Sequence, residues 1–513
     1  MKKTMKKLLS MVALALVGAM TVSCSSDDNI IDQAQQPETK NNVVTLTTTV
    51  SLDGGATTRA LSSTGVKTFA VGETMAIYYW KNKGNDHVKA VSAPLTEGDI
   101  TNGGKSATFT FTLDNPYKDM SVSYVYPAAM ANADFTPNYD ALYNNQDGTL
   151  ATLASNFDFC TRSGAWNGEN LPSLTLENQL AILAVTLKNE AGTSEITGSI
   201  TDLTLSDGTN TYNVTREAVE GPIYVAIRPT TSATITVTTT VGTKNYKKTL
   251  IGKTYAKGNG YPVSWTMAKV VAYSSEINVP AGEHWYIGGS STHNITIGEG
   301  ATVTIGGHLL MQDASIICSG NATIILADGT DANIFNGRIK AGPEGTTLTI
   351  KGNTGELNIY PQNVMGAAIG ASNDACGNIV IEGGIITATE VLQGAGIGAS
   401  NAACGNITIS GGTVTATGSN AGGAGIGSGV SSDAWCGKIT ISGGTVTATG
   451  GMMAAGIGTG EENGCKDITI KSTVTHVTAT KGSYAEASIG AAIDGDSYCE
   501  SVTIEDLTKV TQN

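Results

Sequence analysis

Five cysteines recur at the same position of a repeated segment, and their type and spacing invite chemistry. They are Cys376, Cys404, Cys436, Cys465 and Cys499. Stacked in one column, such thiols could stay reduced as small buried hydrophobes, form disulfides with neighbours or bind a metal. A reduced stack is favoured because parallel side chains point the same way, and an odd number leaves one thiol over. One or two disulfides stay open, whereas ligands in a straight column cannot surround zinc tetrahedrally.

The residue before each of these cysteines should point outward if the chain is extended there. In two repeats that residue is aromatic, Trp435 and Tyr498. Exposed aromatic rings on one edge could stack on sugar rings or anchor a protein partner. They could equally cover a loop or the end of the repeat array. Trp435 and Tyr498 are therefore the candidate ligand-binding residues.

The repeat itself predicts the architecture that holds these residues. Its anchoring isoleucines are separated by 28, 29, 31 and 32 residues, and each unit offers three short strands. A period in this range indicates a solenoid, because no unit can bury its apolar face alone. Stacked in register, the units form a right-handed parallel β-helix with one unit per rung. The isoleucines are Ile369, Ile397, Ile426, Ile457 and Ile489.

Alternation within a unit assigns its two faces. In the second unit Ile407, Ile409, Val414 and Ala416 are predicted to point inward. The threonines of "TVTAT" are predicted to form outward ladders, since a β-branched side chain packs on a sheet while its hydroxyl stays hydrated. The "GAGIG" segments recur in every unit and open no helix, so they are corners of the solenoid rather than phosphate-binding loops.

No catalytic constellation is apparent. The acidic residues of the repeats are scattered through turns, the five histidines show no metal-ligand spacing, and no G-x-S-x-G motif is present. Parallel β-helices that cleave polysaccharides need clustered carboxylates with a basic residue at one cleft. We therefore expect no catalytic residues, no cofactor, no metal and no enzymatic activity.

The first 23 residues resemble a bacterial lipoprotein signal. Four lysines precede an apolar run, and "TVSC" places a small residue before Cys24, which would be lipidated. An ordinary signal peptide with an incidental cysteine is the alternative. Removing these residues leaves 26 basic and 44 acidic residues, a net charge of −18. That sign disfavours nucleic acid as a partner. The "SSDD" after Cys24 resembles a tag for the outer face of the outer membrane.

Strand patterns fill the chain from Val43 to Met267. Segments such as "SATFTFTL" and "MSVSYVYP" alternate apolar and polar residues between turn signals, which is typical of antiparallel β-sandwiches. Within this part, "TTRA", "LENQLAILAVTL" and "GPIYVAI…YPVSWTM" resemble the fimbrillin family of Gram-negative surface lipoproteins. Fimbrillins are pilus subunits of two β-sandwiches, and a protease cut in some members releases an N-terminal strand.

The resemblance implies specific residues for assembly. Arg59 fits the proteolytic cut, and Val43–Leu52 would be the strand that is lost. The vacated groove would accept a strand from another fimbrillin subunit by β-augmentation. Alternatively, Arg59 lies in an exposed loop and is not cut. The repeated sequence of the solenoid also resembles repeat modules of bacterial surface proteins, some of them carbohydrate-binding.

The sequence thus predicts an all-β protein with two N-terminal β-sandwich domains followed by a right-handed parallel β-helix. Its expected function is adhesion at the cell outer membrane through a lipid anchor, as a fimbrial tip subunit or as a glycan-binding module that does not polymerise. The partner would be a host or microbial glycan or protein; a spacer, a degradative enzyme and an ice-binding solenoid are weaker alternatives. The expected segments are a signal peptide at 1–23, a tether at 24–42, sandwiches at 43–187 and 188–268, an irregular solenoid start at 269–365 and repeats at 366–513.

Overall fold

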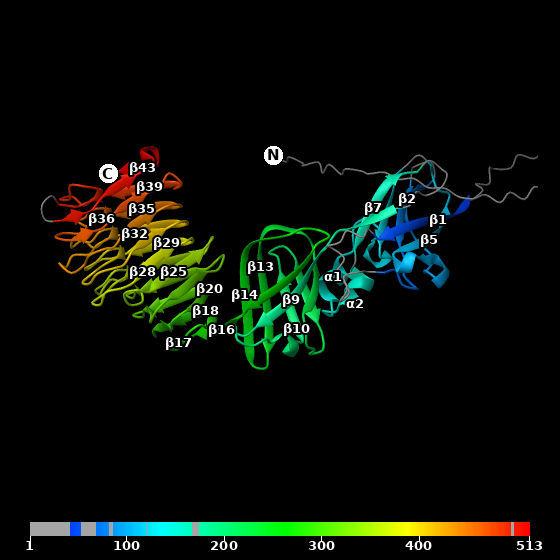
Figure 1. Ribbon diagram of the computed structural model, residues 1–513, viewed down its shortest axis with the longest axis horizontal. Coiled ribbons are helices and arrows are strands. Elements are labelled where there is room, and N and C mark those ends of the chain that lie inside the picture. Colours follow the sequence, from blue (N-terminus) through cyan, green and yellow to red (C-terminus); the bar gives the residue numbers. More distant parts are fainter. Residues whose placement is uncertain are drawn as a thin grey trace, which may run out of the picture. The chain divides into compact units, whose positions relative to one another are not determined.

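The computed structural model describes residues 42–52, 68–81, 86–118, 121–157, 159–166, 174–493 and 497–513. Nearly all of its regular structure is β-strand, which confirms the predicted fold class (Figure 1). Two compact units are present. The first comprises Met1–Leu187, Glu195–Val241 and Lys248–Trp265, and the second comprises Lys188–Ser194, Gly242–Lys247 and Thr266–Asn513.

An eight-stranded sheet forms the first part of unit 1, in the order β3-β2-β6-β7-β8-β1-β5-β4. Its strands bury alternate residues, as β5 buries Phe109 and Phe111. Strand β8 joins the two halves of the sheet, because Leu174 pairs with β1 and Asn178 with β7. Both halves contribute to one apolar core. The strands are β1 (Val43–Leu52), β2 (Ala76–Lys81), β3 (Asp86–Val91), β4 (Ile100–Thr101), β5 (Ser106–Asp114), β6 (Ser121–Tyr126), β7 (Cys160–Ala165) and β8 (Leu174–Asn178).

Two further sheets follow in unit 1. One has the order β12-β9-β15, and the other contains β10, β11, β13 and β14 in that order. The buried amide of Gln146 donates to the Ala226 carbonyl and accepts from the Ala226 N–H, both at 2.8 Å, which ties the helical segment to β12. The elements are α1 (Asp140–Asn144), α2 (Leu150–Thr152), β9 (Ala181–Lys188), β10 (Asp202–Ser206), β11 (Thr211–Thr215), β12 (Ile223–Ile227), β13 (Thr230–Val241), β14 (Lys244–Tyr255) and β15 (Gly260–Thr266).

Unit 2 is a parallel solenoid built from three rows of stacked strands (Figure 1). The first row contains β17 (Ile277–Val279), β19 (Ile295–Ile297), β21 (Ile316–Cys318), β24 (Ile339–Lys340), β27 (Ile369–Gly370), β30 (Ile397–Gly398), β33 (Ile426–Gly427), β36 (Ile457–Gly458) and β40 (Ile489–Gly490). The second contains β16 (Ala268–Tyr273), β18 (His284–Ser291), β20 (Ala301–Gln312), β22 (Ala322–Leu326), β25 (Thr347–Gly352), β28 (Asn378–Ile381), β31 (Ile407–Ile409), β34 (Ile439–Ile441), β38 (Ile468–Ile470) and β42 (Val502–Ile504). The third starts in the second half of β18, which pairs with the second half of β20, and continues through β23 (Asp331–Phe335), β26 (Glu356–Tyr360), β29 (Ile385–Thr389), β32 (Thr413–Thr417), β35 (Thr445–Thr449), β39 (His476–Thr480) and β43 (Val510–Gln512).

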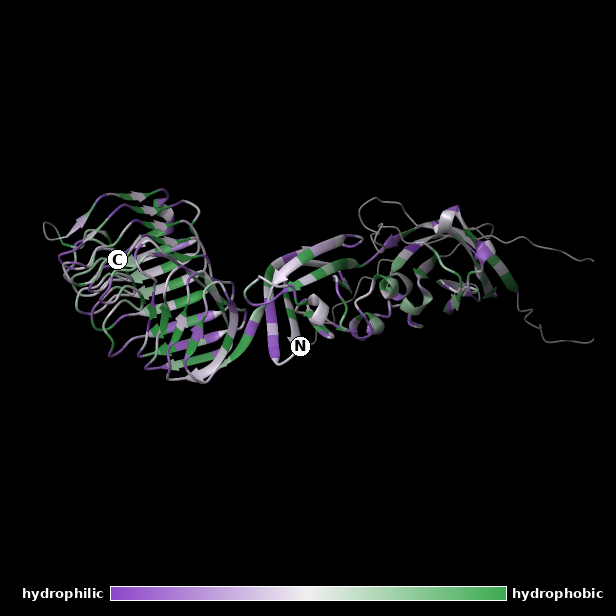
Figure 2. Cartoon of the chain, turned by 60° about the horizontal axis from the view of Figure 1, so that its bottom comes forward, coloured by the Kyte–Doolittle hydropathy of each residue, from purple (hydrophilic) through white to green (hydrophobic). Residues whose placement is uncertain are grey.

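The predicted register is confirmed. The five anchoring isoleucines pair in sequence along the first row, and the first four of them are fully buried. Ile407 and Ile409 face the interior, and the threonines of β32 face outward. Figure 2 shows bands of apolar residues crossing the stacked strands. Burying each isoleucine stabilises the fold by about 1.5–3 kcal/mol, so the columns are the main source of stability.

Rung stacking begins well before the obvious repeats. In the stretch predicted to be irregular, Ile316 pairs with Ile339, which pairs with Ile369 of the first repeat. Stacking therefore requires apolar residues at matching positions of successive rungs, and the rest of the sequence need not repeat. The irregularity lies in the connections, which change length from rung to rung.

In the repeats, glycine at the end of each first-row strand from β27 to β40 is a structural requirement. Gly398 has a φ of 135°, and a Cβ there would lie 2.1 Å from the carbonyl oxygen of Gly427 in the next rung. The equivalent position in the next rung, Gly427, has a φ of 138° and faces Gly458 in the same way. Only glycine combines this left-handed conformation with so close a backbone approach. The second glycine of "GIG" therefore sets the rung spacing at this corner.

The first edge of the solenoid is covered within unit 2. Tyr246, from the tip of the β13–β14 hairpin, pairs antiparallel with Lys269 of β16. Beside it lies the buried carboxylate of Glu190, which accepts hydrogen bonds from Lys244 Nζ and the Tyr246 hydroxyl, each at 2.6 Å. Burial alone would raise the pKa of Glu190, but these two bonds outweigh it and lower the pKa. The paired part of this edge, Ala268 and Lys269, is therefore not available to a foreign strand.

A buried charged pair lies where the varied rungs meet the regular ones. Arg338 precedes β24 and Glu390 follows β29, and their exposed fractions are 4% and 2%. Neither terminal nitrogen of Arg338 nor Oε2 of Glu390 has a hydrogen-bond partner among the described residues. Burial raises the pKa of Glu390 to about 7, against the attraction of Arg338. The carboxyl is thus held near its point of ionisation.

This pair predicts a pH-dependent stability. The folded protein holds the Glu390 proton more tightly than the unfolded chain, whose ordinary glutamate pKa is 4.5. Stability should therefore fall as the pH rises from 4.5 towards 7, by up to about 3 kcal/mol, and stay level above that. Urea denaturation at about pH 5 and about pH 8 should show this loss, and Glu390→Gln should remove it.

The matched control is Glu382→Gln, since Glu382 pairs with Lys351 at 2.8 Å on the surface, where both side chains are 44% exposed. This variant should keep the pH dependence of the parent. An unchanged dependence in Glu390→Gln would contradict the assignment.

Candidate functional site

The two aromatic candidates lie on one outward column of the solenoid. The exposed fractions of Trp435 and Tyr498 are 47% and 57%, so both rings point outward, as the alternation predicts. Tyr498 begins β41 (Tyr498–Cys499), which pairs in register with β37 (Gly464–Cys465). Gly464 therefore occupies the position of the same column between the two rings.

Gly464 explains how the tryptophan lies. A Cβ at Gly464 would sit 2.2 Å from Cζ3 of Trp435, so the indole ring covers this glycine. Because neighbouring rungs are about 4.8 Å apart, the ring reaches along the column towards Tyr498. Trp435, Gly464 and Tyr498 occupy one column across three rungs, and we call these three residues the aromatic strip.

Polar groups accompany the strip three residues further along each rung. Lys438 Nζ pairs with an Asp467 carboxylate oxygen at 2.7 Å, and the Ser501 hydroxyl donates to Asp467 at 2.8 Å. The bonds from Lys438 and Ser501 hold the pKa of Asp467 below its usual value. We call Lys438, Asp467 and Ser501 the polar ladder. It offers donors and acceptors beside apolar ring faces, the combination that binding sites use for orientation and specificity.

A second aromatic feature was missed by sequence analysis. The rings of Phe335 and Tyr360 stack with centroids 5.7 Å apart on the outer face of β23 and β26. Below them, the same face continues as the outward threonines of β32 and β35. Both residues end an alternating strand, "DANIF" and "ELNIY", and that shared position was the available signal.

The predicted assembly strand, β1, lies inside the first sheet. β1 lies between β5 and β8, and its side chains Leu46 and Val50 are buried. It pairs with β5 along nine residues. Removing it would expose the apolar core of the first sheet. Cys24 and Arg59, the predicted lipidation and cleavage residues, lie outside the described residues.

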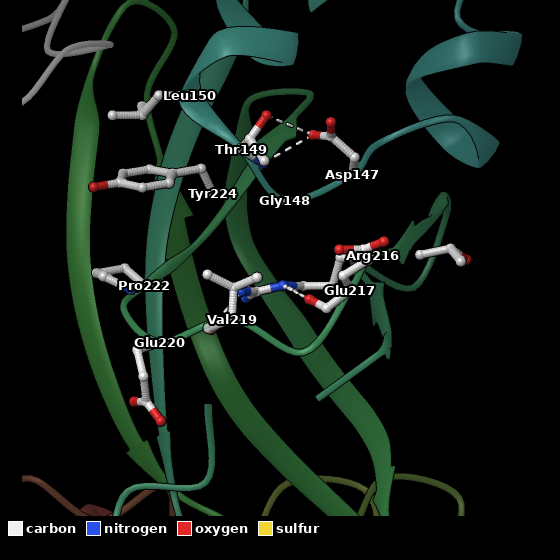
Figure 3. Close-up of a pocket in the computed structure, with 11 residues that line it drawn as sticks. Asp147, Gly148, Thr149, Leu150, Arg216, Glu217, Val219, Glu220, Pro222 and Tyr224 are labelled. Carbon is white, nitrogen blue, oxygen red and sulfur yellow. Dashed lines mark hydrogen bonds between the residues drawn. The ribbon is translucent and has the colours of Figure 1, made fainter. Parts of the chain in front are cut away.

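Unit 1 also contains a pocket of about 770 Å³ between the end of β11 and the helical segment (Figure 3). Asp147 accepts from the Thr149 N–H at 2.9 Å and from its hydroxyl at 2.8 Å. Arg216 donates to the Val219 carbonyl at 2.6 Å, while its Nη1 has no partner among the described residues. Burial lowers the pKa of Arg216. This pocket was not predictable from local sequence patterns, because its walls come from distant segments.

Within the part of the chain that the structure describes, no three histidine, cysteine, aspartate or glutamate side chains come together to hold a metal ion. No described helix has the length and apolar character needed to cross a bilayer.

Comparison with protein-family models agrees with the predicted repeats of the solenoid. A family model described as a beta helix repeat matches residues 379–401, 407–430 and 439–461. Among curated proteins, no sequence matches the chain.

Solved structures of several surface proteins are similar at low identity. One is a fimbrial assembly protein from Parabacteroides distasonis, with 12% identity, a TM-score of 0.24 and coverage of 44% of this chain and 92% of that one. Another, provisionally named a cell adhesion protein, comes from Bacteroides uniformis, with 14% identity, a TM-score of 0.25 and coverage of 43% and 93%. A third, named in the same way, comes from Bacteroides fragilis, with 14% identity, a TM-score of 0.25 and coverage of 43% and 89%. At these TM-scores the similarity carries no conclusion about the function of this chain.

Proposed function

We propose that the protein is a surface adhesin whose solenoid binds a glycan along the aromatic strip. The observation that carries this proposal is the column of Trp435, Gly464 and Tyr498, in which the six-membered ring of the tryptophan covers the glycine and the side chain remains about half exposed. The faces of exposed aromatic rings suit the C–H faces of sugars.

The surroundings favour a sugar chain over a protein partner. The strip is narrow and follows the solenoid axis, so it suits an extended ligand. The polar ladder can exchange hydrogen bonds with hydroxyl groups, since Lys438 donates and Asp467 accepts. The strip is also held by stacked backbone, so little conformational entropy is lost when a ligand binds.

Binding should depend on the tryptophan. A glycan array probed with the full chain should identify a ligand, and Trp435→Ala should weaken its binding at least about tenfold, or roughly 1.4 kcal/mol, with unchanged thermal stability. Tyr484→Ala is the matched control, because Tyr484 is 66% exposed but lies outside the column. Full binding by Trp435→Ala would refute the site, and binding to no glycan would favour a spacer.

The ring can also be displaced without being removed. In Gly464→Ala, the added methyl group occupies the place of the Trp435 ring, so the ring must swing away from the column. We expect weakened glycan binding together with a shifted tryptophan emission. A Trp435→Phe background should abolish the fluorescence change that Gly464→Ala causes. Normal affinity in Gly464→Ala would mean that glycan binding does not require the Trp435 ring to lie over Gly464.

The N-terminal unit supports a second proposal: the protein is first anchored through Cys24 and then, released from this anchor by a cut after Arg59, joins other fimbrillin-like subunits. The specific support is the central position of β1, with Leu46 and Val50 buried between β5 and β8. A cut after Arg59 would release β1, and a strand from another subunit would then cover the same core. A subunit at the tip of a fimbria has to accept such a strand but need not donate one.

The mature N-terminus tests this proposal. N-terminal sequencing of surface-purified protein should find a chain that begins at Ala60, and Arg59→Ala should retain the preceding segment. Denaturation-resistant ladders on gels should appear for the parent and disappear for Arg59→Ala. An intact lipidated Cys24 in all surface protein would rule out the cut and leave an anchored adhesin that does not polymerise.

Binding rather than catalysis remains our proposal for the solenoid. Its acidic side chains engage in surface pairs such as Lys340–Asp374 at 2.7 Å and Lys351–Glu382 at 2.8 Å. These carboxylates belong to separate ion pairs on the outer surface, whereas glycoside hydrolysis needs two carboxyl groups facing one bond.

A further inference from the structure

The cysteine column is continuous through the repeats. Backbone bridges link Cys376 to Cys404, Cys404 to Cys436 and Cys436 to Cys465, and β37 pairs Cys465 with Cys499. The first four thiols are buried, and Cys499 is partly exposed. The column therefore lines one inner corner of the solenoid, with a single accessible member in the last rung.

The sulfur atoms are not evenly spaced. Cys376 Sγ lies 3.3 Å from Cys404 Sγ, and Cys465 Sγ lies 3.1 Å from Cys499 Sγ. Cys436, between these pairs, contacts no other described sulfur; its Sγ lies 4.0 Å from the Gly405 carbonyl oxygen. The five thiols thus form two close pairs and one single residue.

We propose that the column is oxidised to two disulfides between neighbouring rungs, Cys376–Cys404 and Cys465–Cys499, and that Cys436 stays a thiol. In-register neighbours lie about 4.8 Å apart, within the Cα separation that disulfides adopt. Closing each bond requires the two sulfur atoms to approach by about 1 Å, which rotation of the side chains can supply. An odd number of cysteines is compatible with this pairing, because the fifth, Cys436, remains a reduced thiol.

The accessible pair provides a route for oxidation by a small-molecule disulfide such as oxidised glutathione. The Cys465 thiol donates a hydrogen bond to Cys499 Sγ, which lowers the pKa of Cys499. The Cys499 thiolate attacks one sulfur of the small disulfide, whose S–S bond breaks and releases one thiolate. That thiolate takes the Cys465 proton, and Cys465 then displaces the second small thiol from Cys499. One small disulfide is reduced to two thiols for each bond formed in the protein.

The two bonds would hold different parts of the solenoid. Cys376–Cys404 links the first two regular repeats, which follow the change in rung length. Cys465–Cys499 fastens the last described rung, in which Val502 is 44% exposed and no described strand follows β42 in its row. A terminal rung makes half the contacts of an inner one and opens first. A covalent link there restrains the part that is least well held.

Peptide mapping of the full chain tests the pairing. The protein is refolded in a buffer of oxidised and reduced glutathione, denatured, alkylated and digested. We expect linked peptides for Cys376–Cys404 and Cys465–Cys499 and an alkylated Cys436. When native reduced protein is treated with oxidised glutathione, Cys465–Cys499 should form first, because the other pair is buried. Alkylation of all five thiols, or any bond to Cys436, would overturn the proposal.

Matched variants separate covalent stapling from packing. Oxidation should raise the thermal midpoint of the parent. Cys499→Ser should remove the second bond and, with it, the part of this rise that the bond contributes. Cys436→Ala, which alters the same column without losing a predicted bond, should keep both linked peptides and the full rise. Equal midpoints for the oxidised and reduced parent, together with absent linked peptides, would show that the column acts only by packing.

Discussion

Parallel stacking in register is the constraint on which the second unit depends. Each rung presents only three short strands, and none of them can bury an apolar face by itself. Stacking supplies two things at once: backbone hydrogen bonds to the rungs above and below, and continuous columns of side chains such as the one through Ile397 and Ile426. Because identical positions meet across every interface, one substitution is felt by two neighbouring rungs. The glycines at Gly398 and Gly427 are part of the same constraint, since their carbonyls lie where a Cβ would be.

Sequence patterns predicted the features that recur from rung to rung and missed those that do not recur. The isoleucine columns, the outward threonines and the exposure of Trp435 all follow from a period and an alternation, which are local properties of the chain. Residues 269–365 were expected to form an irregular start of the solenoid, but individual pairings such as that of Ile316 with Ile339 were not visible, because connections of changing length hide the matching columns. The strand character of the segment from Val43 to Met267 was likewise visible, but which strand lies beside which was not, because pairing joins distant segments.

Interactions between single, unrepeated side chains were beyond prediction. Glu190 and Lys244 meet only because a loop and a hairpin tip fold onto the first rung. Arg338 and Glu390 are buried together although neither stands in an apolar pattern. The pocket beside Arg216 combines residues from two segments some seventy positions apart. Nothing in the spacing of these residues signals contact, so the structure alone reveals them. The predicted roles of Cys24 and Arg59 depend on modification and cleavage, which packing does not test.

The inner and outer sides of one corner are coupled by this architecture. Trp435 immediately precedes Cys436, and Tyr498 immediately precedes Cys499, so each ring is carried by the backbone that places a column thiol. The backbone pairing of Gly464 with Tyr498 continues directly into that of Cys465 with Cys499. Any restraint on the last sulfur pair therefore also restrains the position of the tyrosine. Trp435 belongs to an inner rung, whereas Tyr498 belongs to the last described rung. The length of the surface offered to a ligand therefore depends on how firmly that last rung is held. A corner that is packed inside and aromatic outside thus ties the stability of the solenoid end to the shape of the aromatic strip.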